Sequence, residues 1–155
     1  MKIGHGYDVH QFTDGNKVTL AGIEIPYEKG ILAHSDGDVI IHALCDAMLG
    51  ALALGDIGHY FPDTDKKYKT IPSKYFLEQC MDLLREKQCS VGNLDVTLIA
   101  QAPKIAPHIR VMRENLANIM QIHIEKINIK ATTTEHLGFI GRKEGIACHV
   151  VVLLK

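Results

Sequence analysis

Apolar residues recur with helical spacing in three segments of the chain. In residues 38–54 the apolar face consists of Val39, Leu44, Ala47, Met48, Ala51 and Leu52. In residues 72–87 it consists of Phe76, Leu77, Cys80, Met81 and Leu84, and in residues 106–121 of Ile109, Met112, Leu116 and Ile119. Because side chains three and four residues apart share one face of a helix, these patterns predict three amphipathic helices.

Polar and small residues mark the ends of the first helix. Ser35-Asp36-Gly37-Asp38 fits a capping box, with Ser35 as the N-cap and an acid three residues later. Gly55 is the predicted end of this helix, because glycine accepts the left-handed backbone of a C-terminal cap. Residues 55–71 are polar and rich in turn residues, which is typical of a loop.

Extended segments occupy most of the remaining chain. Lys2–Gln11 and Lys17–Ile25 are predicted to pair as a hairpin across the turn at residues 14–16. Further strands are predicted at residues 93–100, 127–131 and 146–154. Helices between strands indicate an α/β (α+β) fold. We expect a small four-stranded mixed sheet with helices packed on one face, plus an N-terminal hairpin.

Composition and charge narrow the possible function classes. The 155 residues fit a single domain spanning 1–155, and the formal net charge of -1 gives no general attraction to nucleic acid. No apolar run approaches the length of a membrane span, and the N-terminus resembles neither a signal peptide nor a transit peptide. The four cysteines are scattered without a Cys-x-x-Cys pair. We therefore expect a cytoplasmic protein with reduced, mostly buried cysteines and no membrane or nucleic-acid partner.

Asp8 and His10 are the first candidates for chemistry. They lie two residues apart on a predicted strand, so their side chains project from the same face. A carboxylate and an imidazole side by side could supply two ligands of a zinc site, and His34 or His42 could supply the third. The fourth tetrahedral position would then stay open, as in catalytic zinc sites. The alternative is a surface Asp beside an unrelated His.

The two candidate third ligands differ in their surroundings. Asp46 lies one helical turn after His42 and could accept the second ring N–H of that histidine, as outer partners of ligating histidines do. A plain ion pair on the helix surface is the alternative. His34 precedes the helix instead, where an anion near the helix N-terminus would suit it.

Two loops add polar groups suited to a phosphorylated ligand. Residues 55–65 combine two glycines with three carboxylates, which could bind a polyol or form an ordinary acidic turn. Thr132, Thr133 and Thr134 follow a predicted strand and offer hydroxyl and N–H groups to a phosphate, although threonine is also a common strand residue. Glu135 beside a phosphate would be a plausible Mg²⁺ ligand.

Taken together, these segments resemble the 2-C-methyl-D-erythritol 2,4-cyclodiphosphate synthase family of the non-mevalonate isoprenoid pathway. The matching stretches run in the family's order along the whole chain. They are GYDVH at 6–10, HSDGD, HA and DA within 34–47, GDIG and FPDTD within 55–65, QAPK at 101–104, and ATTTE, GF and GRKEG within 131–145.

The resemblance implies a lyase reaction and an assembly. The substrate would be 4-diphosphocytidyl-2-C-methyl-D-erythritol 2-phosphate, whose 2-phosphate attacks its own diphosphate and releases CMP. The family's homotrimer would place one site at each subunit interface. A channel along the three-fold axis of the family can accept isoprenoid diphosphates.

The resemblance also implies roles for particular residues. Zn²⁺ would bind Asp8, His10 and His42, and Mg²⁺ or Mn²⁺ would lie near Glu135. His34 and Thr133 would steady the transition state. The erythritol phosphate end would contact Ser35, Asp56, Phe61, Pro62, Asp63, Thr64 and Asp65. The neighbouring subunit would enclose the cytidine with Ala100, Gln101, Ala102, Pro103, Lys104, Ile105, Ala106 and Thr132. Ile57, Gly58 and Thr134 would also bind substrate. Phe139 and Arg142 would contact substrate, or Arg142 would belong to the channel.

Two rival hypotheses are consistent with a zinc site. A zinc-dependent phosphohydrolase of a nucleoside diphosphate derivative would hold hydroxide in the open position and release inorganic phosphate. A non-catalytic trimer with structural zinc is the other. Structural sites usually carry four protein ligands rich in cysteine, and no cysteine adjoins Asp8, His10 or His42 in the sequence.

Overall fold

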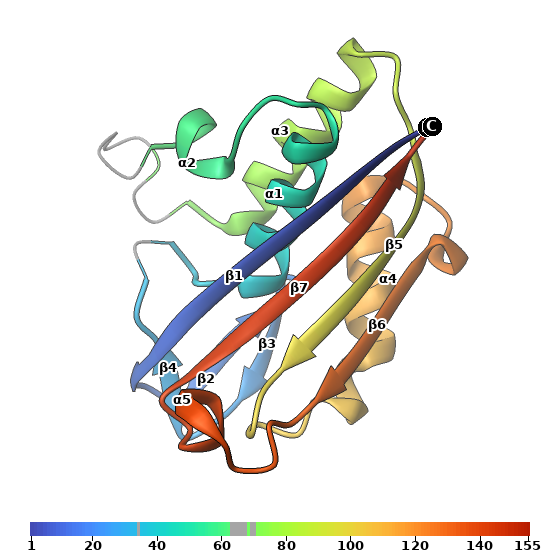
Figure 1. The fold of residues 1–155 in the computed structure, drawn as a ribbon. Coiled ribbons are helices and arrows are strands. Elements are labelled where there is room, and N and C mark those ends of the chain that lie inside the picture. The colour runs from blue at the N-terminus through green and yellow to red at the C-terminus, as the bar shows by residue number, and fades with distance from the viewer. Residues whose placement is uncertain (34, 63–67, 69–70) are drawn as a thin grey trace.

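A five-stranded mixed sheet forms the centre of the computed structural model, which describes residues 1–33, 35–62, 68 and 71–155. The strands follow the order β4-β1-β7-β5-β6 (Figure 1). Their bounds are Lys2–Asp14 for β1, Lys29–Ile31 for β4, Val91–Ile99 for β5, Ile127–Thr132 for β6 and Gly145–Leu154 for β7. Only β5 and β6 are parallel, and the other neighbours are antiparallel.

The prediction of four strands was wrong by one edge strand. The missing strand, β4, has three residues and pairs with the end of β1, where Phe12 lies opposite Ile31. Three residues are too few to show an alternating pattern, so this strand has no detectable period. The mixed sheet with a helical layer was predicted correctly in its main features.

The predicted N-terminal hairpin was also wrong in its pairing. Residues 17–25 do not pair with β1; they belong to a separate two-stranded sheet formed by β2 (Lys17–Leu20) and β3 (Ile23–Pro26). The turn between them consists of Ala21 and Gly22, with φ angles of 51° and 74°. Positive φ at both central residues is the geometry that lets a two-residue turn join twisted antiparallel strands.

Three helices cover one face of the sheet (Figure 1). They are α1 (Val39–Ala51), α3 (Ser73–Glu86) and α4 (Ile109–Met120), close to the three predicted segments. Short helical turns occupy the connections: α2 (Ile57–Tyr60), η2 (Ala106–His108), η3 (Ile124–Lys126) and α5 (Gly138–Gly141). The amphipathic pattern located the long helices because each buries one stripe against the sheet.

The ends of α1 differ from the prediction. Asp38, not Ser35, is the N-cap, and its carboxylate accepts hydrogen bonds from the backbone N–H groups of Ile40 and Ile41. The Ser35 hydroxyl accepts from Gly37 N instead, within the preceding turn. The helix ends at Ala51, before the predicted Gly55, and Ala53 takes the left-handed conformation with φ 57°.

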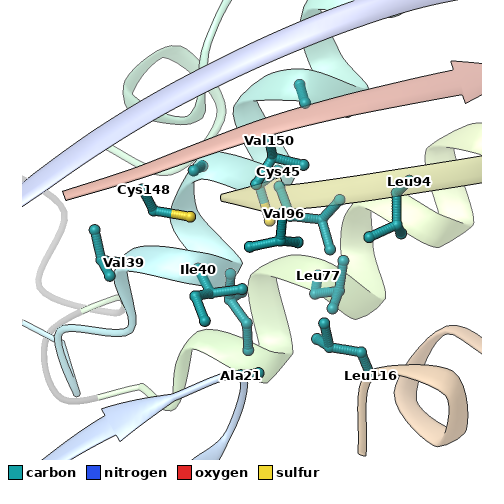
Figure 2. Packing of buried hydrophobic residues seen from close by; sticks show 14 of the residues in the cluster. Ala21, Val39, Ile40, Cys45, Leu77, Leu94, Val96, Leu116, Cys148 and Val150 are labelled. Atoms are coloured by element: carbon teal, nitrogen blue, oxygen red, sulfur yellow. The ribbon is translucent and has the colours of Figure 1, made fainter. Parts of the chain in front are cut away.

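The hydrophobic core lies between the sheet and the helices. Figure 2 shows Cys45 and Leu77 from the helices packing against Val96, Cys148 and Val150 from the sheet. All four cysteines are free thiols, and all but the half-buried Cys89 are buried, as expected. Burial raises the pKa of the Cys45 thiol well above its usual value, so this group stays protonated and takes no part in nucleophilic chemistry.

The two chain ends meet at one corner of the sheet. Lys2 of β1 pairs with Leu154 of β7, and both termini lie at the same end of the molecule (Figure 1). Asp8 and His10 lie farther along β1, toward its other end. The first strand therefore separates the termini from the candidate chemistry.

Candidate metal centre

Two elements bring the candidate ligands together. Asp8 and His10 project from β1 toward α1, and His42 lies in the first turn of that helix. The approach is close because glycines occupy β1 beneath the helix. A β-carbon on Gly4 would lie 1.8 Å from the Ala47 carbonyl oxygen, and one on Gly6 would lie 1.9 Å from the Ala43 carbonyl oxygen. No side chain fits there, so the helix backbone rests directly on the strand.

The three ligand atoms form a nearly equilateral triangle. His10 Nε2 lies 3.1 Å from His42 Nδ1, and Asp8 Oδ2 lies 3.2 Å from each of these nitrogens. Tetrahedral coordination with bonds of roughly 2.0–2.1 Å would separate the ligand atoms by about 3.3 Å. Two imidazoles and a carboxylate with this spacing fit Zn²⁺ or a similar divalent ion. The sequence-based choice of His42 as third ligand agrees with this geometry.

The site is neither sealed nor fully open. The side chains of His42, His10 and Asp8 keep 14%, 16% and 23% of their surface exposed, respectively. No cysteine belongs to the group, and among the residues that the structure describes no fourth protein ligand joins it. A ligand can therefore reach the remaining corner of a tetrahedral ion, as a catalytic site requires and a closed structural site does not.

The two histidines differ in their affinity for protons. Burial lowers the pKa of His10, and the Asp8 charge offsets only part of this effect. Burial also acts to lower the pKa of His42, but the hydrogen bond and charge of Asp8, with the charges of Asp38 and Asp36, outweigh it and raise that pKa. A bound cation must therefore compete with a proton mainly at His42.

The outer partner predicted for His42 was wrong. The Asp46 carboxylate accepts a hydrogen bond of 2.8 Å from Ile57 N, and so ties the loop after α1 to the helix. His42 Nε2 instead lies 2.9 Å from the Ser73 hydroxyl and 3.3 Å from the Ser35 hydroxyl. Sequence reasoning missed Ser73, because a serine at a helix start gives no sign of a partner 31 residues away.

The first loop predicted to bind substrate is described only in part. His34, Asp63, Thr64 and Asp65 lie outside the described residues. Asp56 caps α2, where its carboxylate accepts from His59 N at 2.8 Å. Ile57 and Gly58 form the first turn of α2, and Pro62 follows the loop's phenylalanine.

An aromatic cluster supports this side of the metal centre. Phe61 is buried, with its ring centroid 4.9 Å from that of Phe76, which lies 6.3 Å from the His42 ring. The predicted contact residue Phe61 therefore also packs in the wall behind the ligands. Such a wall restricts the rotation of the imidazole.

The threonine loop lies far from the metal ligands within one chain. Along one row of the sheet, Asp8 pairs with Cys148, Cys148 with Leu98, and Leu98 with Ala131. Asp8 and Ala131 are thus three strands apart, roughly 14 Å at ordinary strand spacing. A single chain does not bring Thr132–Glu135 to the triad.

The loop itself is ordered by its own hydrogen bonds. Thr133 Oγ1 donates to Glu135 Oε1 at 3.2 Å and accepts from Glu135 N at 3.3 Å, while Thr134 Oγ1 donates to Leu137 O. Glu135 takes φ 50°, and its carboxylate is exposed. The Thr133 hydroxyl and the Glu135 carboxylate are therefore both accessible at the surface. The hydroxyl could bind an anion, and the carboxylate could bind a cation.

The predicted cytidine segments lie side by side. Ala100 N donates to Thr132 O at 3.0 Å, and Gln101 Oε1 accepts from His136 N at 3.1 Å. The peptide between Ala102 and Pro103 is cis. Ala100 and Ile105 are buried, whereas Lys104 and Ala106 are exposed.

Phe139 and Arg142 lie at the α5 turn. Phe139 is 40% exposed, and Arg142 forms a two-point ion pair with Glu144 through contacts of 2.9 and 3.0 Å. Neither residue contacts the triad in this chain. Their guanidinium and aromatic groups stay accessible at the surface.

Among the residues that the structure describes, none of the helices has the length and apolar character of a membrane span.

Comparison with known proteins covers the whole chain. The sequence model of the YgbB family matches residues 1–155. The 2-C-methyl-D-erythritol 2,4-cyclodiphosphate synthase of Francisella philomiragia is 64% identical over 99% of this chain and 97% of its own length. The protein of the same name from Azotobacter vinelandii is 60% identical over 99% of this chain and 98% of its own length.

Solved structures agree in fold. The bifunctional IspDF of Campylobacter jejuni superposes with a TM-score of 0.95 at 47% identity, and the match covers 99% of this chain but only 42% of that one. The IspF of Plasmodium falciparum in complex with CDP gives a TM-score of 0.87 at 37% identity, covering 99% of this chain and 94% of that one. The chain therefore belongs to the YgbB family of 2-C-methyl-D-erythritol 2,4-cyclodiphosphate synthases, lyases of isoprenoid biosynthesis.

Proposed function

We propose that this chain converts 4-diphosphocytidyl-2-C-methyl-D-erythritol 2-phosphate into 2-C-methyl-D-erythritol 2,4-cyclodiphosphate and CMP. An oxygen of the 2-phosphate forms a bond to the β-phosphorus. The bond from that phosphorus to the oxygen bridging the α-phosphate breaks, and CMP leaves with this oxygen. The observation that carries the proposal is the open triangle of Asp8, His10 and His42 in a chain 64% identical to a cyclodiphosphate synthase.

The reaction needs no nucleophile from the protein. The attacking oxygen belongs to the substrate, so the chain must fold a flexible, highly charged molecule until its ends meet. Holding reacting groups in line can contribute roughly 7–11 kcal/mol. Zn²⁺ at the triad, with Mg²⁺ or Mn²⁺ near Glu135, would supply positive charge to the phosphate oxygens and polarise their bonds to phosphorus.

The remaining residues have binding roles in this proposal. Ser35, Asp56 and the loop that begins at Phe61 hold the erythritol phosphate end, while the segment from Ala100 to Ala106 with Thr132 encloses the cytidine. His34 and the Thr133 hydroxyl stabilise the negative charge on the oxygens of the transferred phosphoryl group in the transition state. The likeness to a CDP complex at 37% identity supports a cytidine diphosphate end of the ligand.

The separation within one chain supports a homotrimer with sites between subunits. The triad and the threonine loop lie on strands three places apart, so in this proposal the two halves of each site come from neighbouring protomers. The sheet face opposite the helices also supports assembly. It exposes Ile3, Tyr7, Val9 and Val151 at 73%, 46%, 41% and 40%. An apolar patch on one sheet face is typical of a subunit contact.

The test is product identity. The purified protein is incubated with the diphosphocytidyl substrate, Zn²⁺ and Mg²⁺, and ³¹P NMR follows the phosphorus resonances. We expect a cyclic diphosphate together with CMP. Inorganic phosphate in place of the cyclic product would favour the phosphohydrolase instead. Light scattering after size exclusion tests the trimer, and a monomer with full turnover would overturn the shared site.

A further inference from the structure

Behind the metal ligand His42 lies a chain of two hydrogen-bonded side chains, Ser73 and Asp36. The Ser73 hydroxyl contacts His42 Nε2 at 2.9 Å and the Asp36 carboxylate through a short hydrogen bond. Ser73 lies at the start of α3 and is fully buried. We infer that Ser73 and Asp36 are positioning residues, which fix the ring nitrogen that His42 presents to the metal. This inference rests on the metal site of the proposed function.

The direction of each hydrogen bond follows from the donors available. A carboxylate only accepts, so the single O–H of Ser73 must point to Asp36. The serine oxygen then has only lone pairs to offer to His42, and Nε2 must carry the hydrogen that it accepts. Nδ1 is consequently the nitrogen whose lone pair is free for a cation held between His42, Asp8 and His10. The same nitrogen lies 3.1 Å from His10 Nε2.

Asp36 is itself held by the backbone. Its Oδ2 accepts from Ser73 N at 3.0 Å, and its Oδ1 accepts from Asp38 N at 3.3 Å. The carboxylate thereby binds an otherwise unpaired N–H at the start of α3, where a negative charge is favourable. The position of the serine hydroxyl is therefore set by two elements, α3 and the turn before α1.

Two other groups could have this role, and the contacts argue against each. Ser35 Oγ lies farther from His42 Nε2, at 3.3 Å, and also accepts from Gly37 N at 3.2 Å. Asp46 lies one turn along the helix, but its carboxylate is bonded to Ile57 N. Ser73 has the shortest contact to Nε2 and the only one backed by a carboxylate among the described residues.

The chemical consequence is a preset tautomer. Outer partners of this kind typically change metal affinity by about 10- to 100-fold when they are removed. Without Ser73 the neutral ring can place its hydrogen on either nitrogen and can rotate. With the substitution Asp36→Asn, the new amide can donate to the serine oxygen, so the serine O–H can turn toward Nε2 and favour the wrong tautomer.

The experiment measures zinc affinity by chelator competition on the full chain. Wild type, Ser73→Ala, Asp36→Asn and Asp46→Asn are compared, with thermal unfolding of each metal-free variant. We expect about a 10- to 100-fold loss of affinity for Ser73→Ala and Asp36→Asn, and a change below about threefold for Asp46→Asn. Ser73→Thr retains the hydroxyl and should restore most of the lost affinity.

A second measurement does not depend on the metal. Long-range ¹H–¹⁵N spectra of histidine-labelled, metal-free protein, recorded at alkaline pH where the ring is neutral, should show a slowly exchanging Nε2–H on His42, which is lost in Ser73→Ala. Unchanged zinc affinity together with an unchanged Nε2–H in Ser73→Ala would overturn the inference. Wild-type protein that shows this N–H but makes no cyclic product would refute the proposed function and leave the hydrogen-bond assignment standing.

Discussion

A β-carbon on Gly6 would lie 1.9 Å from the carbonyl oxygen of Ala43, far inside van der Waals contact. Ala43 directly follows His42 of the candidate metal triad, and Gly6 precedes Asp8 by two residues on the same face of β1. The spacing of the ligand triangle thus depends on backbone contact between a strand and a helix. This contact exists only because the strand residue lacks a side chain.

Gly6→Ala should therefore damage both the fold and the metal site. The added methyl must push α1 away from β1, which we expect to lower the free energy of unfolding by about 1–3 kcal/mol or more. The same displacement should weaken zinc binding. Denaturant unfolding and chelator competition measure the two effects. Gly50→Ala is the matched control, because a β-carbon there meets nothing within 4 Å. Ala in place of a helical Gly should stabilise by roughly 0.5–1 kcal/mol.

His42→Ala should abolish cyclisation and lower zinc content, because it removes one of three ligands. Metal analysis and ³¹P NMR of the reaction measure the two losses. His123→Ala serves as the control, because it also removes a histidine but lies outside the triad, at the start of η3 between α4 and β6. Wild-type turnover in His42→Ala would remove His42 from the metal centre.

Zinc binding should release a proton from His42 near neutral pH. The pKa of this ring is raised from its usual value in the metal-free fold, because the Asp8 contact and nearby acids outweigh burial. The ring therefore binds its proton more tightly than a free imidazole does. Burial lowers the pKa of His10, so His42 is the main source of the released proton. Zinc affinity should fall as pH decreases from 8 to 6.

Calorimetry in buffers with different ionisation enthalpies counts the protons that zinc binding releases.

The raised pKa of His42 also affects the stability of the metal-free fold. A raised His42 pKa stabilises the fold fully below pH 6.5, and this contribution is lost as pH rises through the folded-state value. Proton release that is absent at pH 6.5 would contradict the assignment of His42 as the protonated ring.

Asp38→Ala should destabilise the fold strongly. The buried carboxylate accepts from Ala21 N and Gly22 N in the β2–β3 turn, and from two N–H groups of α1. Its loss leaves these donors unpaired, which we expect to cost about 2–4 kcal/mol in unfolding experiments. Asp82→Ala, which removes an exposed ion pair with Arg85, should change stability by less than about 1 kcal/mol.

The pH dependence of Asp38 gives a separate check. Burial raises its pKa from 3.8 to about 6, although hydrogen bonds from Gly22, Ile41 and Ala21 act to lower it. Because the folded state binds this proton more tightly, the stabilisation is complete below pH 3.8 and is lost as pH rises through about 6. Asp38→Asn should remove this component of the stability curve. An identical pH slope in both proteins would contradict the shift.

The sequence predicted those features that depend on nearby residues. Helical spacing located α1, α3 and α4, and the two-residue spacing of Asp8 and His10 placed both on one strand face. The β2–β3 hairpin was missed because Ala21, with φ 51°, gives a weaker turn signal than the Asp14-Gly15-Asn16 stretch. Resemblance to a family, not periodicity, singled out His42 from His34.

Contacts between distant segments could not be predicted from local patterns. Ser73 meets His42 only after α3 has packed beside α1, and no spacing in the sequence encodes that approach. Asp46 had the expected helical spacing from His42, yet the loop after α1 uses its carboxylate for Ile57 N. Helical spacing alone therefore predicts a possible hydrogen-bond partner for His42, but tertiary packing determines which group lies nearest.

The meeting of the two termini makes this fold suited to gene fusion. Lys2 pairs with Leu154, and six residues of β1, roughly 20 Å, separate that corner from Asp8. An additional catalytic unit joined at either terminus would be attached at this corner, away from the candidate metal triad. The match to the bifunctional Campylobacter jejuni protein covers 42% of that chain, which leaves room there for further structure. A circular permutant that joins residues 1 and 155 should also keep its ligands in place.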